Sequence, residues 1–329
     1  MATTERLYYD HPSLRTFDAI VLRTEARPGH GAIWLDRTAF YPTSGGQPFD
    51  TGTIGGLPVV NVEDDDGGDV VHVVTGPLPE AGSAVQGEID WMRRFDHMQQ
   101  HTGQHLLSAV LERAFNARTV SFHLGADSST IDLDRELTPA ELAGGEREAN
   151  RVVWGDVPVT IRYATEEEAR HLPLRKESVR TGTVRLVEIH GVDLSACGGT
   201  HVGSSGAIGQ VVLASWERFK GGQRLEFLCG GRALARFQQL RDTAAASTRL
   251  LSVLPADLPA AIERLQGEAK EQRRAAAALQ ADLATFEAVA LAGTAEVLPV
   301  GRVVLQAVDG DAARLKTLAS ATAATPGTV

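Results

Sequence analysis

The 329-residue sequence predicts an α+β fold in four consecutive parts. Short apolar runs punctuated by Gly, Pro and Asp fill residues 1–90, which favours a small β-barrel. Residues 91–229 combine one long, histidine-bearing amphipathic helix with several strands, so we expect an α/β domain whose antiparallel sheet surrounds that helix. Heptad repeats in residues 230–291 predict an antiparallel coiled-coil hairpin, and residues 292–329 have the pattern of an incomplete further α/β domain.

Composition narrows the class of protein. A hydrophobic content of 43% and a charged content of 22% are typical of a globular protein. There is no apolar run of about 18 residues and no signal peptide, and two cysteines are too few for a disulfide framework. We therefore expect a cytoplasmic protein without a membrane partner. A net charge of -10 argues against broad nucleic-acid affinity but leaves room for a local basic patch.

The barrel part contains a glycine-rich segment at residues 38–52. The predicted strands around it lie at 18–22, 32–35 and 70–74. Gly45 and Gly46 predict a hairpin turn with positive φ angles, and Gln47 follows them directly. The segment is therefore a sharp turn that also presents a polar side chain.

His101 and His105 are predicted to lie on one face of the long helix. Its apolar face is formed by Leu106, Leu107, Val110, Leu111 and Ala114. A spacing of four residues places the two histidines one turn apart, and His97 is in register with both. Taken alone, such a pair is more often an ordinary histidine pair than a metal site. Residues 102–104 lack the Glu of the zinc-peptidase motif, which disfavours that chemistry.

Strands and short helices complete the second part. The strands are predicted at 117–124, 129–134, 157–163, 184–189, 208–215 and 224–229. Thr138-Pro-Ala-Glu141 has the hydroxyl cap, Pro and Glu of a helix start. The carboxylates at 166–168 suit the N-terminus of a short helix better than catalysis.

A second run, Cys197-Gly-Gly-Thr-His201, again places two metal-binding side chains four positions apart. Its glycines allow a tight loop whose backbone N–H groups could hold an anion. Alone, Cys197 could equally be a small buried residue. With His101 and His105, the run supplies the nitrogen and sulfur donors that zinc takes in tetrahedral geometry. We expect the two runs to meet in space, and we expect Cys229 to pack in the core.

Apolar residues recur at alternating steps of three and four in the third part. The positions are Phe237, Leu240, Ala244, Ser247, Leu251 and Leu254, then Ile262, Leu265, Ala269, Gln272, Ala276, Leu279, Leu283, Phe286 and Ala290. The hairpin would be either a dimerisation arm, giving a homodimer, or a link between two domains. In the last part, a strand at 301–308, a helix at 312–321 and a second strand opening at 325–329 cannot bury their own faces. We therefore expect the chain to stop inside a domain.

The two histidine-containing runs resemble motifs of a known family. His101-Thr-Gly-Gln-His105-Leu-Leu and Cys197-Gly-Gly-Thr-His201-Val are similar to the zinc-binding pair of the alanyl-tRNA synthetase editing domain. The free-standing relatives of that domain are the AlaX-type alanyl-tRNA editing proteins.

A third motif agrees in order and spacing. Phe40-Tyr-Pro-Thr-Ser-Gly-Gly-Gln47, continued by Asp50-Thr-Gly52, resembles the glycine-rich segment of the domain that precedes editing in that family. The resemblance covers about residues 1–291, and the tail resembles the start of the DHHA1 domain of the long AlaX form.

The resemblance implies a zinc-dependent hydrolase that deacylates mischarged tRNA(Ala) in trans and without ATP. Seryl-tRNA(Ala) is the expected main substrate and glycyl-tRNA(Ala) a second candidate. His101, His105, Cys197 and His201 would be the zinc ligands. Four protein ligands would make the ion structural, whereas three would leave a position for water, and both alternatives stay open. No aminoacylation domain precedes residue 1, so a stand-alone editor is expected.

Further functional residues are expected around the zinc ligands. The catalytic candidates are Gln104, Thr119 and Ser121, the loop beside the substrate comprises Gly45, Gly46 and Gln47, and the tRNA contacts are Arg93, Arg94, Arg218, Lys220 and Arg224. Thr119 or Ser121 would bind the serine hydroxyl, because a pocket that hydrogen-bonds a hydroxyl rejects the analogue lacking it. Either residue could instead be an ordinary strand hydroxyl, and the basic residues could be solvated surface charges.

Two other functions fit the same motifs. One is a non-catalytic tRNA-binding module with a structural zinc. The other is a zinc esterase of small molecules, although a coiled coil and a partial tail have little use there. The residues leave open how tRNA(Ala) is selected and how the coiled coil pairs.

Overall fold

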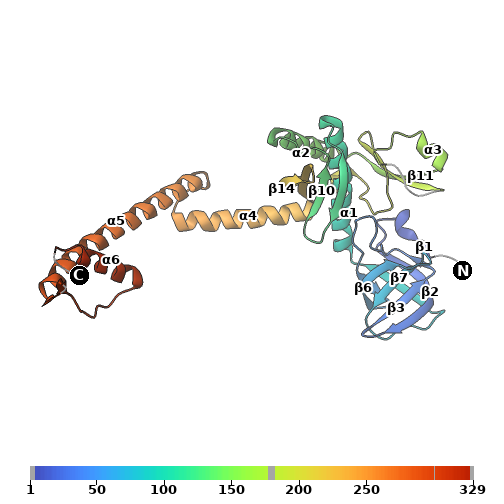
Figure 1. Ribbon diagram of the computed structural model, residues 1–329. Helices are drawn as coiled ribbons and strands as arrows, with labels where there is room; N and C mark the ends of the chain where they lie inside the picture. Colours follow the sequence, from blue (N-terminus) through green and yellow to red (C-terminus); the bar gives the residue numbers. More distant parts are fainter. Residues whose placement is uncertain (1–3, 177–181, 300, 327–329) are drawn as a thin grey trace. The chain divides into compact units, whose positions relative to one another are not determined.

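The computed structural model describes residues 4–176, 182–299 and 301–326 (Figure 1). The chain divides into two compact units, residues 1–239 and 240–329. The predicted α+β class is confirmed, since a closed barrel, further sheets and helices are all present. The predicted division of the chain at residues 90, 229 and 291 stays a prediction.

A closed barrel forms the N-terminal part of the first unit, as predicted. Its strands, in spatial order, are β2 (Thr16–Arg27), β3 (His30–Leu35), β7 (Val70–Val74), β6 (Leu57–Asp64), β5 (Gly52–Ile54) and β8 (Ala84–Ile89). A short parallel pair, β1 (Glu5–Arg6) with β4 (Arg37–Thr38), and the 3-10 helix η1 (Leu7–Tyr9) accompany it. Val21, Ile33, Ile54 and Val62 lie in one buried cluster that forms the barrel core.

His72 of β7 is a fully buried histidine of the barrel. Its Nε2 is 2.8 Å from Thr38 Oγ1, and its Nδ1 is 3.1 Å from the carbonyl oxygen of Ile33. Burial disfavours the charged imidazolium and lowers the pKa of His72 to about 4. His72 is therefore a neutral packing residue at pH 7.

Acid is expected to weaken the folded state through His72. The unfolded chain takes up this proton below about pH 6.5, but the folded chain does so only near pH 4. At pH 4.5 the loss of unfolding free energy from this residue is about 2.5 kcal/mol. Urea unfolding at pH 7 and 4.5 measures it, and His72→Gln, which does not titrate, is expected to lose less by that amount. Equal losses in both proteins would contradict the assignment.

The long helix α1 (Trp91–Phe115) is the central element of the rest of this unit. Asp90 caps its N-terminus by accepting the Arg93 backbone N–H at 3.2 Å. Asn116 ends it in the left-handed conformation, with φ of 53°. α1 is the long, histidine-bearing helix that the sequence predicts.

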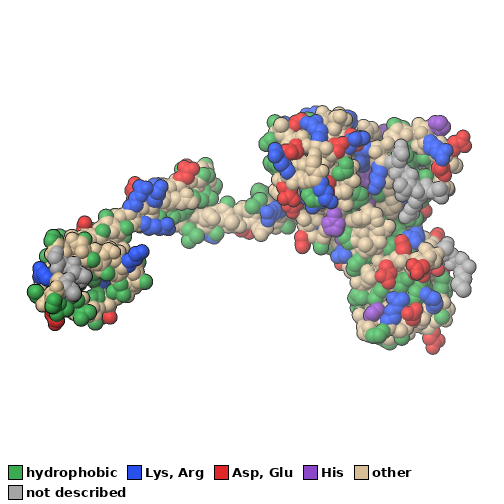
Figure 2. Space-filling view, in the orientation of Figure 1, with side chains coloured by type: hydrophobic (Ala, Val, Ile, Leu, Met, Phe, Trp, Pro, Cys, Tyr) green, Lys and Arg blue, Asp and Glu red, His purple; other side chains and the backbone are tan. Residues whose placement is uncertain are grey.

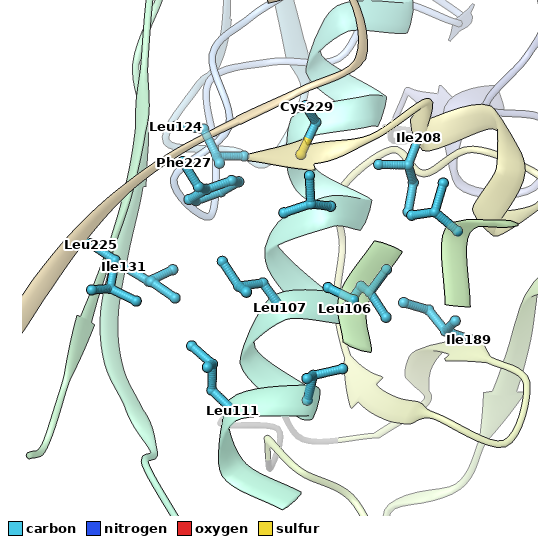
Figure 3. Packing of buried hydrophobic residues seen from close by; sticks show 14 of the residues in the cluster. Leu106, Leu107, Leu111, Leu124, Ile131, Ile189, Ile208, Leu225, Phe227 and Cys229 are labelled. Atoms are coloured by element: carbon cyan, nitrogen blue, oxygen red, sulfur yellow. The ribbon is translucent and has the colours of Figure 1, made fainter. Parts of the chain in front are cut away.

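The leucines of α1 pack against a four-stranded antiparallel sheet. Its strands, in spatial order, are β14 (Val211–Phe219), β15 (Gly222–Cys229), β10 (Ser129–Leu133) and β9 (Thr119–Leu124). Figure 3 shows the resulting cluster, which includes Leu106, Leu107, Leu111, Leu124, Ile131, Leu225 and Phe227. The helix approaches β15 closely, because a Cβ on Gly103 would lie 2.2 Å from Cys229 Sγ. Cys229 is fully buried in this cluster, which confirms its predicted packing role.

A three-stranded antiparallel sheet leads into the second metal-binding run. It consists of β11 (Val159–Ala164), β12 (Val184–Ile189) and β13 (Asp193–Ala196). The predicted strands do not include β13, which pairs with β12 and ends directly before Cys197. The helices α2 (Pro139–Trp154) and α3 (Glu166–Arg170) begin with capping boxes, and η2 (Ser205–Ile208) is a 3-10 helix.

Long helices dominate the C-terminal region. Its elements are α4 (Gly230–Leu251), which begins in the first unit, η3 (Pro255–Asp257), α5 (Leu258–Gly293), β16 (Glu296–Leu298), β17 (Gly301–Val303) and α6 (Ala312–Ala323). Many heptad residues are exposed in the single chain, among them Leu240, Leu265, Leu279 and Phe286. The α5 residues Ala284 and Ala288 pack instead against Leu318 of α6. The helices are observed, but their coiled-coil pairing stays a prediction.

Two further details concern this region. The strand predicted at 301–308 is shorter and pairs with β16. Of the strand predicted at 325–329, residues 327–329 lie outside the described residues. The segment Pro255–Gly293 is long enough, and contains a stretch apolar enough, to cross a membrane by length and composition alone. One such helix is weak evidence for a membrane span.

Candidate metal centre

Four side chains from the two motif runs converge in the first unit. His101 and His105 of α1 meet Cys197 and His201 from the loop after β13, with one donor atom of each within 4.8 Å of the others. Cys197 Sγ lies 3.4 Å from His101 Nε2 and 3.3 Å from His201 Nε2. The expectation that the two runs meet in space is confirmed, and the group could hold a metal ion. His97 does not belong to this group.

Gly199 of the Cys197–His201 loop is needed for close packing. A Cβ on Gly199 would lie 2.2 Å from His101 Cε1, so a side chain there would displace the imidazole. Gly199 donates its backbone N–H to Cys197 Sγ at 3.4 Å, and the N–H of Thr200 is bonded to Gln47 Oε1 at 3.1 Å. These two N–H groups are therefore not free for an anion, which corrects the predicted oxyanion role for them.

The Nδ1 atom of His105 is bonded to a carboxylate. Asp193 Oδ2 accepts from His105 Nδ1 at 2.9 Å, and Asp193 also binds Arg175 Nε at 2.6 Å and the hydroxyl of Ser195. Burial alone would raise the pKa of Asp193, but His105 and Arg175 outweigh it and lower the pKa to about 2. Because a carboxylate only accepts, His105 carries a proton on Nδ1 and directs Nε2 to the metal group.

The Nδ1 atom of His101 is bonded to the amide of Gln47. Gln47 Oε1 lies 2.8 Å from His101 Nδ1, and Gln47 Nε2 donates to Thr200 Oγ1 at 2.8 Å. His101 therefore also carries its proton on Nδ1, since an amide oxygen only accepts.

The Nδ1 atom of His201 is bonded to the hydroxyl of Thr102. Thr102 Oγ1 donates its single proton to the carbonyl oxygen of Met98 at 2.8 Å. It therefore accepts from His201 Nδ1 and from the backbone N–H of Val202, each at 3.2 Å. Together with the two preceding contacts, this bond leaves Nε2 of all three histidines available to a metal.

The protonation of the group also favours metal binding. Burial alone would raise the pKa of Cys197, but His101 and His201 outweigh it and hold this pKa well below its usual range. The thiolate, the form that binds metals, is therefore favoured. Burial, followed by the neighbouring His101, lowers the pKa of His201 to about 3. Nitrogen and sulfur donors of this kind suit a transition metal better than Mg²⁺ or Ca²⁺, which prefer oxygen.

A cavity of about 660 Å³ opens beside the metal group. Its lining includes His101, His105 and Cys197, the predicted Gln104, Thr119, Ser121 and Gly45, and the residues Tyr9, Tyr41, Glu112, Arg118, Phe122, Tyr163, Arg175, Lys176 and Arg185. Gly46 and Gln47 do not line it, and Gln47 is fully buried. Of the three residues predicted to lie beside the substrate, only Gly45 therefore lines the cavity, and Gln47 instead contacts His101 and the backbone of Thr200.

The predicted catalytic candidates form two separate contacts in the cavity wall. Gln104 Nε2 donates to Ser108 Oγ at 2.9 Å, and Thr119 Oγ1 donates to the same atom at 2.7 Å. Ser121 instead donates to Asp132 at 2.5 Å. Both hydroxyls therefore donate their proton within the wall and keep their lone pairs as acceptors, but Thr119 is bonded to a neutral hydroxyl and Ser121 to a carboxylate that also pairs with Arg224.

Comparison with known proteins agrees with the motifs. Residues 184–226 match the family described as the threonyl and alanyl tRNA synthetase second additional domain. The chain is 36% identical to the alanyl-tRNA editing protein AlaX-L of Pyrococcus horikoshii over 79% of its own length and 66% of the relative's. The chain belongs to the alanyl-tRNA editing family.

Two other relatives show what share of a relative's length this chain matches. Identity to the alanyl-tRNA editing protein Aarsd1-B of Xenopus laevis is 36%, over 78% of this chain and 63% of that protein. Identity to an alanine–tRNA ligase of Pyrococcus abyssi is 37%, over 85% of this chain and 32% of the ligase. The chain therefore spans about two thirds of the editing proteins and about one third of the ligase.

The basic residues predicted to bind tRNA are not those of the cavity. Of Arg93, Arg94, Arg218, Lys220 and Arg224, none lines it. Arg218 is paired with Glu136 at 2.9 Å and Arg224 with Asp132 at 2.7 Å. The cavity cations Arg118, Arg175, Lys176 and Arg185 were not predicted from the sequence. On the face visible in Figure 2, acidic and basic side chains are interspersed, without one large basic patch.

Arg94 cannot serve as a tRNA contact, which corrects that prediction. Its side chain is fully buried. Arg94 Nε donates to both carboxylate oxygens of Asp50 at 2.9 and 3.0 Å, and its other nitrogens donate to the carbonyl oxygens of Pro12 and Ala39. Arg94 therefore joins α1 to the barrel.

Replacing Arg94 is expected to destabilise the fold. Arg94→Met leaves the Asp50 carboxylate buried without its partner, so we expect a loss of about 3–5 kcal/mol in unfolding free energy. Arg218→Met, at an exposed ion pair, is the control and is expected to change stability by less than about 0.5 kcal/mol. Denaturant unfolding measures both, and a stable Arg94→Met protein would contradict the structural role.

Proposed function

We propose that the protein is a zinc-dependent aminoacyl-tRNA deacylase that acts in trans on mischarged tRNA(Ala). Seryl-tRNA(Ala) is the main substrate and glycyl-tRNA(Ala) a second one. The observation that carries the proposal is the group of metal donors in the wall of a cavity of about 660 Å³. The choice of substrate rests on family membership, since two of the relatives are named alanyl-tRNA editing proteins.

Zinc is the proposed metal because donor type and spacing fit it. Tetrahedral zinc, with bonds of about 2.0–2.1 Å to nitrogen and about 2.3 Å to sulfur, separates its donor atoms by roughly 3.3–3.7 Å. The distances from Cys197 Sγ to His101 Nε2 and His201 Nε2 are 3.4 and 3.3 Å. We propose His101, His105, Cys197 and His201 as the ligands. If a further position opened beside these four ligands, the bound zinc would supply Lewis-acid polarisation of the ester carbonyl or of a water, and otherwise it would hold the site together.

The proposed proton chemistry does not involve Asp193. Its carboxylate is occupied by His105, Arg175 and Ser195, so it orients His105 and is not free to act as a base. Among the described residues, Glu112 is the carboxylate that lines the cavity. Glu112 follows His105 by seven residues, about 10.5 Å along α1, and is therefore too far from the metal group to act as its base. Proton removal from the attacking water is assigned to solvent, with the neighbouring ribose hydroxyl of the substrate relaying the proton.

Thr119 is the proposed reader of the serine hydroxyl. It donates its own proton to Ser108 Oγ, which leaves its oxygen as an acceptor facing the cavity. Ser108, in turn, is held by Gln104. A hydroxyl acceptor at this point favours seryl over alanyl esters, because alanine would leave it unpaired.

The partner is proposed to be the acceptor end of tRNA(Ala), in the cytoplasm. Lys176 brings positive charge to the cavity of a protein whose net charge is -10, and so does Arg118, although it is paired with Asp134 at 3.0 Å. They are better placed for the phosphates of the 3′ end than the basic residues predicted from the sequence. The exposed heptad residues of α4 and α5 remain the proposed contact of a homodimer.

Serine release from seryl-tRNA(Ala) tests the deacylase proposal. We expect the zinc-loaded protein to release serine, and Cys197→Ala and His105→Ala to lose at least about 100-fold in rate because ligand loss weakens the metal. Cys229→Ala, which removes the core cysteine, is the matched control and is expected to keep zinc and activity.

Two other outcomes would point to the competing functions. A protein that holds zinc and binds tRNA(Ala) without releasing serine would be a binding module. A protein that cleaves small seryl esters as efficiently as seryl-tRNA(Ala) would be a general esterase.

Thr119→Val is expected to weaken the hydrolysis of seryl-tRNA(Ala) selectively. Loss of one hydrogen bond to the substrate hydroxyl corresponds to about a tenfold lower kcat/KM. Glycyl-tRNA(Ala), which lacks that hydroxyl, is expected to be hydrolysed as before. Ser121→Ala, at the hydroxyl already bonded to Asp132, is expected to change the ratio little. Equal losses on both substrates in Thr119→Val would exclude a reading role.

A further inference from the structure

The buried amide of Gln47 lies where the barrel part meets both metal-binding runs. Its Oε1 contacts His101 Nδ1 at 2.8 Å and the backbone N–H of Thr200 at 3.1 Å. Its Nε2 donates to Thr200 Oγ1 at 2.8 Å. Gln47 is 0% exposed, so these contacts are made away from water.

The chemistry of these contacts sets the state of His101. A backbone N–H only donates, so the amide atom that faces Thr200 N is the oxygen Oε1 and not the nitrogen. The same oxygen faces His101 Nδ1, which must then carry the proton. The Nε2 lone pair of His101 is left facing Cys197 Sγ at 3.4 Å. Without Gln47, nothing in these contacts selects this tautomer of His101.

The hairpin that presents Gln47 is itself held in place. Gly45 and Gly46 have φ angles of 54° and 82°, and Ser44 and Gln47 exchange backbone hydrogen bonds of 3.2 and 2.9 Å across this turn. The carbonyl oxygen of Gly46 accepts the Leu124 N–H of β9 at 3.2 Å. A Cβ on Gly46 would lie 2.7 Å from the Phe122 ring, so the hairpin packs closely against β9.

We propose that Gln47 is a positioning residue through which the barrel sets the metal affinity of the His101–His105–Cys197–His201 centre. The proposal rests on the metal centre of the proposed function but not on the hydrolysis assigned to it. By linkage, an ion that binds more tightly when the hairpin is docked must also favour the docked hairpin. Metal affinity and hairpin docking therefore both measure the same coupling free energy, that between ion binding and the contact of the hairpin with His101.

Two substitutions of similar size separate the hydrogen bond from simple packing. Gln47→Met keeps the length of the side chain but removes the acceptor for His101, and its zinc affinity is expected to fall about 10–100-fold. Gln47→Glu keeps an acceptor for both His101 and Thr200, and its affinity is expected to stay within about threefold of the wild type. Val62→Ala, in the barrel core, controls for loss of barrel stability and is expected to leave affinity unchanged.

Zinc affinity is measured by competition with a chelating dye, and the absorption spectrum of the cobalt(II)-loaded protein reports the donor set. Nitrogen-15 NMR of His101 in the metal-free protein reports the tautomer. We expect the Nδ1–H form in the wild type and in Gln47→Glu, and a mixture in Gln47→Met. Hydrogen exchange at the Leu124 amide, which is bonded to the hairpin, is expected to slow on zinc addition in the wild type and much less in Gln47→Met.

These outcomes separate the proposal from the function. Zinc affinity in Gln47→Met equal to that of the wild type would overturn the proposal even if seryl-tRNA(Ala) is hydrolysed. A Gln47-dependent affinity in a protein that releases no serine would support the proposal and reject the deacylase. An equal loss of affinity in Val62→Ala would reduce the effect to barrel stability and overturn the proposal as well.

Discussion

The buried ion pair between Arg94 and Asp50 is the contact on which the geometry of the metal centre depends. It joins the glycine-rich segment to α1, and it is fully enclosed. His101 follows Arg94 by seven residues, about 10.5 Å along a helix. Gln47 precedes Asp50 by three residues, a separation of at most about 10–11 Å in extended chain. The segment can therefore contact α1 at two points two turns apart, once through the ion pair and once through the bond from Gln47 to His101.

The sequence predicts two kinds of feature well. One is a helix or strand whose apolar residues follow a regular pattern, and the other is a site whose residues form a short motif. Short apolar runs bounded by Gly, Pro and Asp, such as that of β7, identify barrel strands because a buried strand needs only about five consecutive apolar positions. His101 and His105 could be placed on one helical face because four residues make about one turn. The hydroxyl and Glu of Thr138 and Glu141 have one common use, the capping box, which the structure contains.

The functional residues that were not predicted are single residues. They belong to no motif or repeat whose spacing in the sequence could identify them. Asp193 looks like an ordinary turn residue until β13 pairs with β12 and places it beside His105. Arg94 looks like its neighbour Arg93, but consecutive helical residues point about 100° apart, so Arg94 is buried against Asp50 whereas Arg93 is partly exposed and donates to the Phe49 carbonyl oxygen. The heptads of α4 and α5 predict helices correctly, whereas pairing of those helices depends on a partner surface that sequence periodicity does not identify.

The four donor residues differ in whether they line the cavity. His101, His105 and Cys197 line the cavity, whereas His201 does not, since Thr102 and the following backbone cover its other nitrogen. A ligand in the cavity therefore approaches the group from the side of three donors, with His201 behind them. Loss of His105 changes both the donor set and the cavity wall, while loss of His201 changes the donor set alone. His201 is therefore the donor whose replacement tests metal binding without altering the cavity wall.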